Sequence, residues 1–334
     1  MYMILFTICL AILYVISLTR KSPITILSKD KSNAVKGVLA ILIVFHHFST
    51  TCDISGFSEF RRWGAIIVSV FFFMSGYGLG RSMTLKGKAY LSNFLNHRLW
   101  KSVILPYAIA LIIFLVYLNV DVPDASTLVG DWSRGFTLLP NAWFIVALAL
   151  MYLGFYFINK TSGRCHVVKM FLYTLVYIII VYSVGFERCW YVSVIMFPLG
   201  MLYADKENEL VTLLKRFRAR IWLIPLMMGF TGMCFITQTV FSSIIAYMAL
   251  TIALVFVMIS IEVERIGKIG LFSFLSAISY EIYLCHGVAM KMCRSKYLNI
   301  SEDWMFVIAV VALTLILASV VKYIVSRLAG TNRI

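Results

Sequence analysis

The sequence predicts an all-α fold: a polytopic membrane helical bundle with about eleven transmembrane helices. Of the 334 residues, 61% are hydrophobic and only 13% are charged, which lies outside the composition of soluble domains. Eleven apolar runs are long enough to cross a hydrocarbon core about 30 Å thick. When these runs are taken as helices, the connecting loops alternate between rich and poor in Lys and Arg, as expected for a chain that crosses a membrane repeatedly.

The expected spans follow one another along the whole chain, each with boundaries uncertain by several residues. They are 2–18, 35–51, 63–83, 103–120, 142–159, 167–185, 189–204, 220–237, 239–261, 271–290 and 304–326. The first span has no basic leader and is followed by a basic cluster, so residues 1–30 are predicted to form a signal-anchor helix and a cytoplasmic linker.

The distribution of positive charge predicts the orientation of the chain. With the N-terminus outside and the C-terminus in the cytoplasm, the cytoplasmic segments contain 23 of the 30 Lys and Arg residues. This bias also accounts for the net charge of +15, so we expect membrane lipid as a partner and no nucleic acid. The seven cysteines show no CxxC spacing and are expected to be packing residues, and no metal site is predicted. Cys52, Cys189 and Cys293 are expected near the outer face, where a disulfide could form.

Ionisable side chains inside spans are costly and tend to mark function. His47 follows Lys36 by eleven residues, which is three helical turns plus about 20°, so the two side chains share one face about 16 Å apart. His46 lies about 100° further round and cannot point into the same cavity. The alternative is that Lys36 extends to the membrane interface and His47 is a hydrogen-bonded packing residue.

Three further segments combine polar or small residues with apolar ones. Small residues after the aromatic block at 71–73, among them Ser75 and Gly76, suit either close helix packing or a channel for a thin ligand. Arg98 and Lys101 are three residues apart, so both could reach one phosphate group, although the positive-inside bias alone would also explain them.

The span at 271–290 contains Tyr280, Glu281, Tyr283 and His286. Tyr283 and His286 should be neighbours on the helix. Glu281 points elsewhere and is expected to pair with another helix.

Four of these segments, in this order, resemble motifs of the acyltransferase 3 family of bacterial inner-membrane O-acyltransferases, whose core has about ten helices. Lys36, Gly37 and His47 resemble the family's Arg-x10-His motif, and residues 71–77 (FFFMSGY) resemble its FFxxSGF/Y segment. Residues 98–107 are similar to its RxxR and Pro-Tyr segment, and residues 279–286 (SYEIYLCH) to its SYxxYLxH segment. Lys36 and Lys101 stand where the family has arginine, which keeps the charge but loses the planar fork that binds anions with two bonds.

The resemblance implies a membrane acyltransferase domain at 31–334, with the first helix added to the core. It implies transfer of an acyl group from cytoplasmic acyl-CoA, with acetyl-CoA as the expected donor, and no permanently bound cofactor. The expected acceptor is a hydroxyl of a surface or exported polysaccharide, or of its lipid-linked precursor, and polysaccharide-assembly proteins are candidate partners. The expected location is the bacterial inner membrane.

The resemblance and the polar pattern together give the predicted site. His47 is expected to act as a general base or as a covalent acyl carrier. Tyr280, Glu281 and His286 would orient its imidazole or line the acceptor pocket. The expected donor-binding residues are Lys36, Ser75, Gly76, Arg98 and Lys101. Two alternatives remain open: a transporter or flippase of polysaccharide precursors, and a noncatalytic partner of a polysaccharide synthase.

Overall fold

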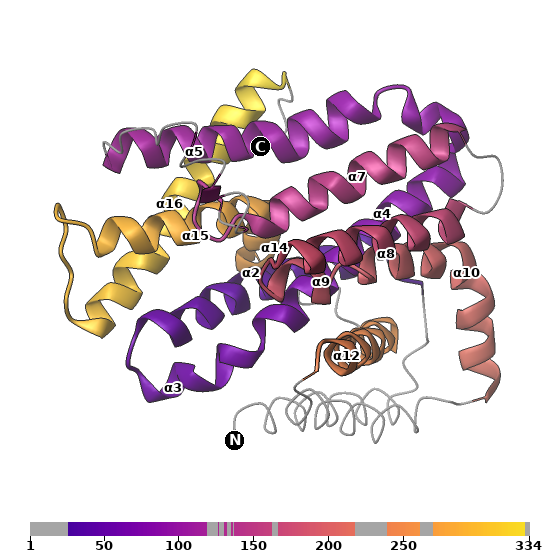
Figure 1. Cartoon of the computed structure of the whole chain (residues 1–334), viewed down its shortest axis with the longest axis horizontal. Coiled ribbons are helices and arrows are strands. Elements are labelled where there is room, and N and C mark those ends of the chain that lie inside the picture. Colours follow the sequence, from indigo (N-terminus) through magenta and orange to yellow (C-terminus); the bar gives the residue numbers. More distant parts are fainter. Residues whose placement is uncertain are drawn as a thin grey trace. The chain divides into compact units, whose positions relative to one another are not determined.

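The computed structural model is helical throughout its described part, which confirms the all-α prediction (Figure 1). The structure describes residues 26–118, 126, 130–131, 135, 137–161, 166–217, 239–260 and 270–330. These residues form two compact units. Unit 1 consists of the described residues of Met1–Thr50, Ser55–Leu85 and Val192–Ala277, and unit 2 of those of Thr51–Ile54, Lys86–Tyr191 and Ile278–Ile334.

Unit 1 is built on four long helices and three short ones. They are α2 (Lys29–Thr51), α3 (Ser55–Ser58), η1 (Glu59–Arg62), α4 (Gly64–Lys86), α10 (Met196–Phe217), α12 (Val240–Ser260) and α14 (Gly270–Ala277). Ser28 caps α2, because its hydroxyl accepts a hydrogen bond from the Lys31 backbone N–H at 3.2 Å. The Lys31 ammonium donates to the Ile259 carbonyl at 3.3 Å, near the end of α12, where carbonyls have no helical partner.

Glycines allow α4 and α10 to touch backbone to backbone. A Cβ on Gly76 would lie 1.9 Å from the Phe197 carbonyl oxygen, and one on Gly200 would lie 2.1 Å from that of Phe73. In the same way, a Cβ on Gly37 of α2 would lie 2.9 Å from the Phe272 oxygen of α14. Of the two interpretations of the small residues around Gly76, close helix packing is therefore present.

Unit 2 contains the remaining helices. They are η2 (Gly87–Leu91), η3 (Leu95–Ile104), α5 (Leu105–Leu118), α7 (Trp143–Thr161), α8 (His166–Val184), α9 (Cys189–Val192), α15 (Ser279–Cys293) and α16 (Asp303–Leu328). The most extensive pairing is between α15 and α16, and α5 packs on both of them and on η3. Helix α7 packs on α8, η2 and η3, and the bare Gly154 of α7 lies against the Tyr173 ring of α8.

Six stretches of helix in the described part are long and apolar enough to cross a membrane. They are Lys29–Thr51, Gly64–Leu91, Leu95–Tyr117, Trp143–Thr161, His166–Val184 and Asp303–Leu328. The pair α14 and α15 adds a seventh if the two helices form one interrupted span. A multi-pass membrane protein is thus supported, whereas the count of about eleven is not confirmed. The expected spans 2–18 and 220–237 lie outside the described residues, and within α12 the apolar stretch is the shorter Val240–Phe256.

Two of the expected spans are not continuous helices in the structure. The span at 189–204 is divided into α9 and α10, and α10 continues to Phe217. Pro198 explains the division, since a proline is tolerated in the first turn of a helix but not further inside it. The span at 271–290 is interrupted at Ile278, where neither proline nor glycine is present, so no local sequence signal marks the break.

The cysteines predicted near the outer face are free thiols in the structure. This holds for Cys52, Cys189 and Cys293. Burial raises the pKa of the Cys52 thiol, which disfavours the thiolate that disulfide exchange needs.

Candidate active site

The predicted catalytic residue His47 and Lys36 lie on the same uninterrupted helix, α2. The eleven-residue spacing therefore keeps the geometry predicted for Lys36 and His47, on one face and about 16 Å apart. Both side chains are half-buried. The His47 carbonyl accepts a hydrogen bond from the Thr50 hydroxyl at 2.9 Å.

His46 has a packing role in unit 1. Its Nδ1 is hydrogen-bonded to the Phe60 carbonyl at 3.1 Å. Its ring fills the space that Gly64 leaves, since a Cβ on Gly64 would lie 2.4 Å from His46 Nε2. The ring centroids of His46 and His47 are 4.8 Å apart. His46 is thus committed to the residues that follow α2, which makes His47 the better candidate for chemistry.

Ser75 and Gly76 lie on α4 in the same unit. Ser75 is half-buried, whereas Gly76 is buried against Phe197 of α10. That contact accounts for the glycine without a ligand, so contact of these two residues with a donor stays a prediction.

The cations Arg98 and Lys101 lie on η3, a π-helix of ten residues in unit 2. π-helical segments are rare, and single-turn ones within α-helices often lie at functional sites. The structure does not bring these two cations together. Arg98 Nε donates to the Tyr90 hydroxyl at 3.0 Å, while Lys101 Nζ donates to the Ala329 carbonyl at 2.8 Å, at the C-terminal end of α16.

A cationic cleft of about 410 Å³ lies beside η3. Its nine described lining residues are Lys86, Ala89, Tyr90, Ser92, Asn93, Phe94, His97, Arg98 and Ser102. They include two permanent cations, a histidine, three hydroxyls and an amide, and no carboxylate. Lys86 lies 6.0 Å from the centre of the Tyr90 ring, whose hydroxyl binds Arg98, so both cations contact one aromatic residue. Such a set of donors around a solvent-sized space suits a phosphate-bearing ligand.

Sequence reasoning missed Lys86 and His97 as members of this cleft. Neither residue lies inside an expected span or stands out as a motif, so neither was predicted to belong to the site. The signal that could have found them is the concentration of cations and hydroxyls, without any acid, between Lys86 and Ser102.

The first turn of α15 is tied to the two helices around it in unit 2. The Tyr280 hydroxyl donates to the Val103 carbonyl of η3 at 2.8 Å. Glu281, only 3% exposed, accepts from Lys322 Nζ of α16 through Oε1 at 3.1 Å, which confirms that it pairs with another helix. In the described part of the chain the other carboxylate oxygen, Oε2, is buried without a hydrogen-bond partner.

Further along α15, His286 is completely buried and contacts Tyr283, as predicted. Their ring centroids are 5.5 Å apart, and His286 Nδ1 lies 3.3 Å from the Ile282 carbonyl. The Tyr283 hydroxyl donates to the Asn141 carbonyl at 2.9 Å, and Asn141 adopts the left-handed backbone (φ 62°) that asparagine tolerates. A Cβ on Gly287 would lie 2.9 Å from the Pro140 oxygen, so the 140–141 turn covers this face of the helix.

A polar cluster in unit 1 was not predicted. The buried Glu207 carboxylate of α10 accepts hydrogen bonds from the Leu27 backbone N–H at 2.7 Å, from the Tyr77 hydroxyl at 2.9 Å and from Arg81, with which it forms an ion pair. Arg81 also donates to the Tyr77 hydroxyl at 3.0 Å. We call Leu27, Tyr77, Arg81 and Glu207 the Glu207 cluster. It fixes the segment before α2 to α4 and α10, so its role in the fold is structural.

Comparison with known proteins gives one match. The family model for the acyltransferase domain of the acyltransferase 3 family matches residues 30–323. No curated protein and no solved structure matches the chain. The match extends over most of the 334 residues and includes each motif described above. The chain therefore belongs to the acyltransferase 3 family and is a membrane acyltransferase.

Proposed function

We propose that this acyltransferase transfers an acyl group, most simply acetyl, from cytoplasmic acyl-CoA to a hydroxyl of a surface or exported polysaccharide or of its lipid-linked precursor. Membership of the family supports acyl transfer. The donor, the acceptor and the location in the bacterial inner membrane are the proposed parts. The positive-inside bias supports an orientation with the N-terminus outside and the C-terminus in the cytoplasm.

The cationic cleft beside η3 is the observation that carries the choice of donor. Coenzyme A has phosphates at one end and a thin arm that ends in the thioester. Lys86 and Arg98 supply the charge, and Asn93 supplies an amide donor, for phosphate oxygens. The Ser92 and Ser102 hydroxyls contribute less, because they donate to the Ala89 and His97 carbonyls at 2.8 and 2.7 Å. Lys101 contributes less to this site, because its ammonium is bound to the Ala329 carbonyl.

His47 is the proposed catalytic residue. Its neutral imidazole takes the proton of the acceptor hydroxyl while the hydroxyl oxygen attacks the thioester carbonyl. The carbon–sulfur bond then breaks, the coenzyme leaves as a thiolate, and the imidazolium returns the proton to that sulfur. In the alternative role, the imidazole nitrogen attacks the thioester carbonyl and the coenzyme leaves as a thiolate. The acceptor hydroxyl then attacks the acyl-imidazole, the carbon–nitrogen bond breaks to release the imidazole, and the hydroxyl proton passes to the thiolate. Lys36, on the same helix face about 16 Å from His47, is proposed to bind the anionic end of the donor.

The proposed function is tested by the ester content of the product. NMR of the surface polysaccharide from cells with and without the gene should show ester signals only in the former. We expect His47→Ala to lower ester content about 100-fold or more while the protein still accumulates in the membrane. Lys29→Ala on the same helix, exposed and outside the predicted site, is the control. Full ester content in His47→Ala at a normal protein level would remove His47 from the mechanism.

One observation favours the alternative of a transporter or flippase. Interrupted transmembrane helices are common at transporter binding sites, and α14 and α15 form an interrupted pair at Ile278. Purified protein in lipid nanodiscs separates the two functions, since only an acyltransferase forms an ester when acyl-CoA and a soluble sugar acceptor are added. Movement of a lipid-linked sugar across vesicles without any ester formed would favour transport.

The orientation has a test of its own. Asn208→Cys on α10 should react with a membrane-impermeant thiol reagent only in opened cells, and Ser301→Cys, in the loop before α16, should react in intact cells. Both positions are exposed. Native Cys52 is removed first. The reverse labelling pattern would invert the orientation and place Lys36 away from cytoplasmic acyl-CoA.

A further inference from the structure

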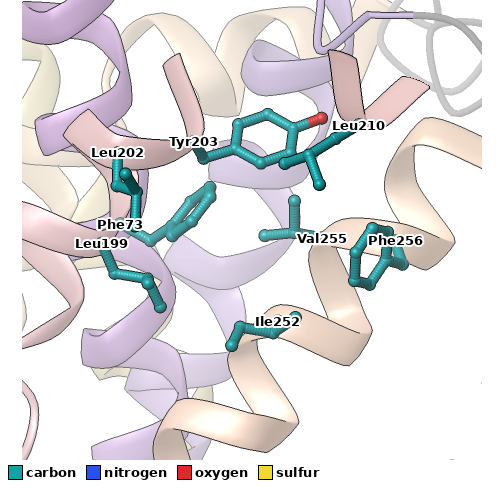
Figure 2. Close-up of a pocket in the computed structure, with 8 residues that line it drawn as sticks. All are labelled: Phe73, Leu199, Leu202, Tyr203, Leu210, Ile252, Val255 and Phe256. Carbon is teal, nitrogen blue, oxygen red and sulfur yellow. The ribbon is translucent and has the colours of Figure 1, made fainter. Parts of the chain in front are cut away.

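An apolar cavity of about 140 Å³ lies within unit 1, between α4, α10 and α12 (Figure 2). Its described lining residues are Phe73, Leu199, Leu202, Tyr203, Leu210, Ile252, Val255 and Phe256. Seven of these eight carry purely hydrocarbon side chains. The lining suits a hydrocarbon ligand, and Tyr203 is its single residue with a polar side-chain atom.

Tyr203 brings one polar atom into this lining. The residue is 7% exposed, and its ring packs on those of Phe73 and Tyr77 with centroids 5.6 and 5.7 Å apart. Within the described residues, its hydroxyl is buried without a hydrogen-bond partner. Figure 2 shows this hydroxyl at the Leu210 side of the cavity, with Leu199 and Ile252 at the opposite side. A buried hydroxyl without a partner is costly, which favours a ligand that has an acceptor at the Leu210 end.

The charges near Tyr203 indicate that the acceptor is neutral. The charged groups that act on it are Glu207 and Arg81. These two form an ion pair with each other inside the Glu207 cluster, so their charges are balanced. A phosphate or carboxylate would find no uncompensated cation at this end of the cavity in the described structure. An ester carbonyl needs only a hydroxyl donor.

We propose that the cavity binds part of one acyl chain of a bilayer glycerophospholipid, with the ester carbonyl of that chain accepting a hydrogen bond from Tyr203. The chain would lie against Leu199, Ile252 and Val255, and the carbonyl would lie at the Leu210 end. This site is separate from the proposed donor cleft and does not depend on which acceptor the enzyme uses.

The test is photolabelling in nanodiscs with a phosphatidylcholine that carries a diazirine in one acyl chain. We expect labelled peptides from α10 and α12. Ile252→Trp, which fills the cavity, should lower this labelling about fivefold or more. Tyr203→Phe, which removes only the hydroxyl, should lower it about two- to fivefold, the loss of one hydrogen bond. Leu213→Trp, at an exposed apolar position on α10 outside the lining, should leave it unchanged.

A second cavity-filling variant, Leu199→Trp, keeps the test valid if Ile252→Trp fails to fold. Unchanged labelling in both tryptophan variants, with thermal stability equal to wild type, would overturn the proposal. A disulfide crosslink in the Ile252→Cys variant between residue 252 and the native Cys234, which lies outside the described residues, would also overturn the proposal. The cavity would then be covered by the chain itself. Loss of labelling in Leu213→Trp equal to that in Ile252→Trp would also count against a specific site.

Discussion

Two buried carboxylates, one in each unit, have the same burial but opposite surroundings. Glu207 in unit 1 is 4% exposed and Glu281 in unit 2 is 3% exposed. Both oxygens of Glu207 accept hydrogen bonds, and its three donor residues come from two separate parts of the chain, Leu27 before α2 and Tyr77 and Arg81 on α4. Glu281 has the Lys322 ammonium on one oxygen, and within the described residues its other oxygen accepts nothing.

The difference separates a structural carboxylate from a candidate for chemistry. A carboxylate whose acceptor positions are all used holds its surroundings in place and has no capacity left for chemistry. A buried carboxylate with an open oxygen can bind a ligand hydroxyl or exchange a proton. We therefore assign Glu207 to the fold and keep Glu281 as a candidate for the acceptor side of the proposed reaction.

The largest effect should come from Glu207→Ala. This variant leaves the Leu27 N–H buried without its acceptor, leaves the Tyr77 hydroxyl only the Leu27 carbonyl at 2.7 Å, and removes the carboxylate partner of Arg81. We expect a loss of about 2–4 kcal/mol, allowing for the partial exposure of Arg81, and therefore poor accumulation in the membrane and a lower Tm in detergent. Glu209→Ala is the matched control, because Glu209 is on the same helix in an exposed pair with Lys206. Equal Tm values for the two variants would show that the cluster is not structural.

Glu281→Gln should lower activity and leave stability nearly unchanged. The amide keeps the volume of the side chain and an oxygen for Lys322, so we expect a stability change of less than about 1 kcal/mol. Acyl transfer should nevertheless fall about tenfold or more, since an amide cannot accept a proton. The measurements are Tm and the pH profile of ester formation. A wild-type rate and profile would assign Glu281 to the fold, as a second structural carboxylate, and would remove the contrast with Glu207.

The cations Arg98 and Lys101 of unit 2 should also differ in role, with Arg98 binding the donor and Lys101 stabilising the fold. Arg98→Gln is expected to raise the Kd for CoA about five- to tenfold, and this difference should shrink at high salt. Lys101→Gln should change the Kd less than about twofold and lower Tm instead, because its ammonium is bound to the Ala329 carbonyl. Lys88→Gln, exposed on η2 and outside the cleft lining, controls for net charge. An equal loss of affinity in all three variants would indicate nonspecific attraction rather than a phosphate site.

Sequence patterns predicted most of the helices and only part of the site. The spans at 142–159, 167–185 and 304–326 lie close to α7, α8 and α16, because a polar or charged residue ends each apolar run. The break at Ile278 has no local signal. The Glu207 cluster joins Leu27 to a residue 180 positions away, a pairing that helical periodicity cannot supply.

The site shows the same limit. The motif residues on α2 and α15 were included in the predicted site because charge inside an apolar run is conspicuous, and their catalytic role stays a prediction. The cleft residues Lys86 and His97 were missed because basic residues between membrane spans are ordinary. The π-helical form of η3 was also outside the prediction, since the spacing of Arg98 and Lys101 was interpreted on an α-helix.

The smallest effect should come from Lys322→Met, and it tests the comparison most sharply. The Lys322 side chain is 46% exposed and makes one ion pair, so water can replace much of what the pair contributes, and we expect a loss of about 1 kcal/mol or less. Arg81→Met should lower Tm more than Lys322→Met does. The guanidinium donates to both Glu207 and the Tyr77 hydroxyl. Without it, the buried Glu207 carboxylate keeps its hydrogen bonds from Leu27 and Tyr77 but loses the positive charge that neutralises it. Both variants remove one positive charge and keep a long apolar side chain, so net charge and packing volume are matched. Equal Tm values for Lys322→Met and Arg81→Met would mean that Glu281 depends on its cation as strongly as Glu207 does, and the distinction between a structural and a reactive carboxylate would fail.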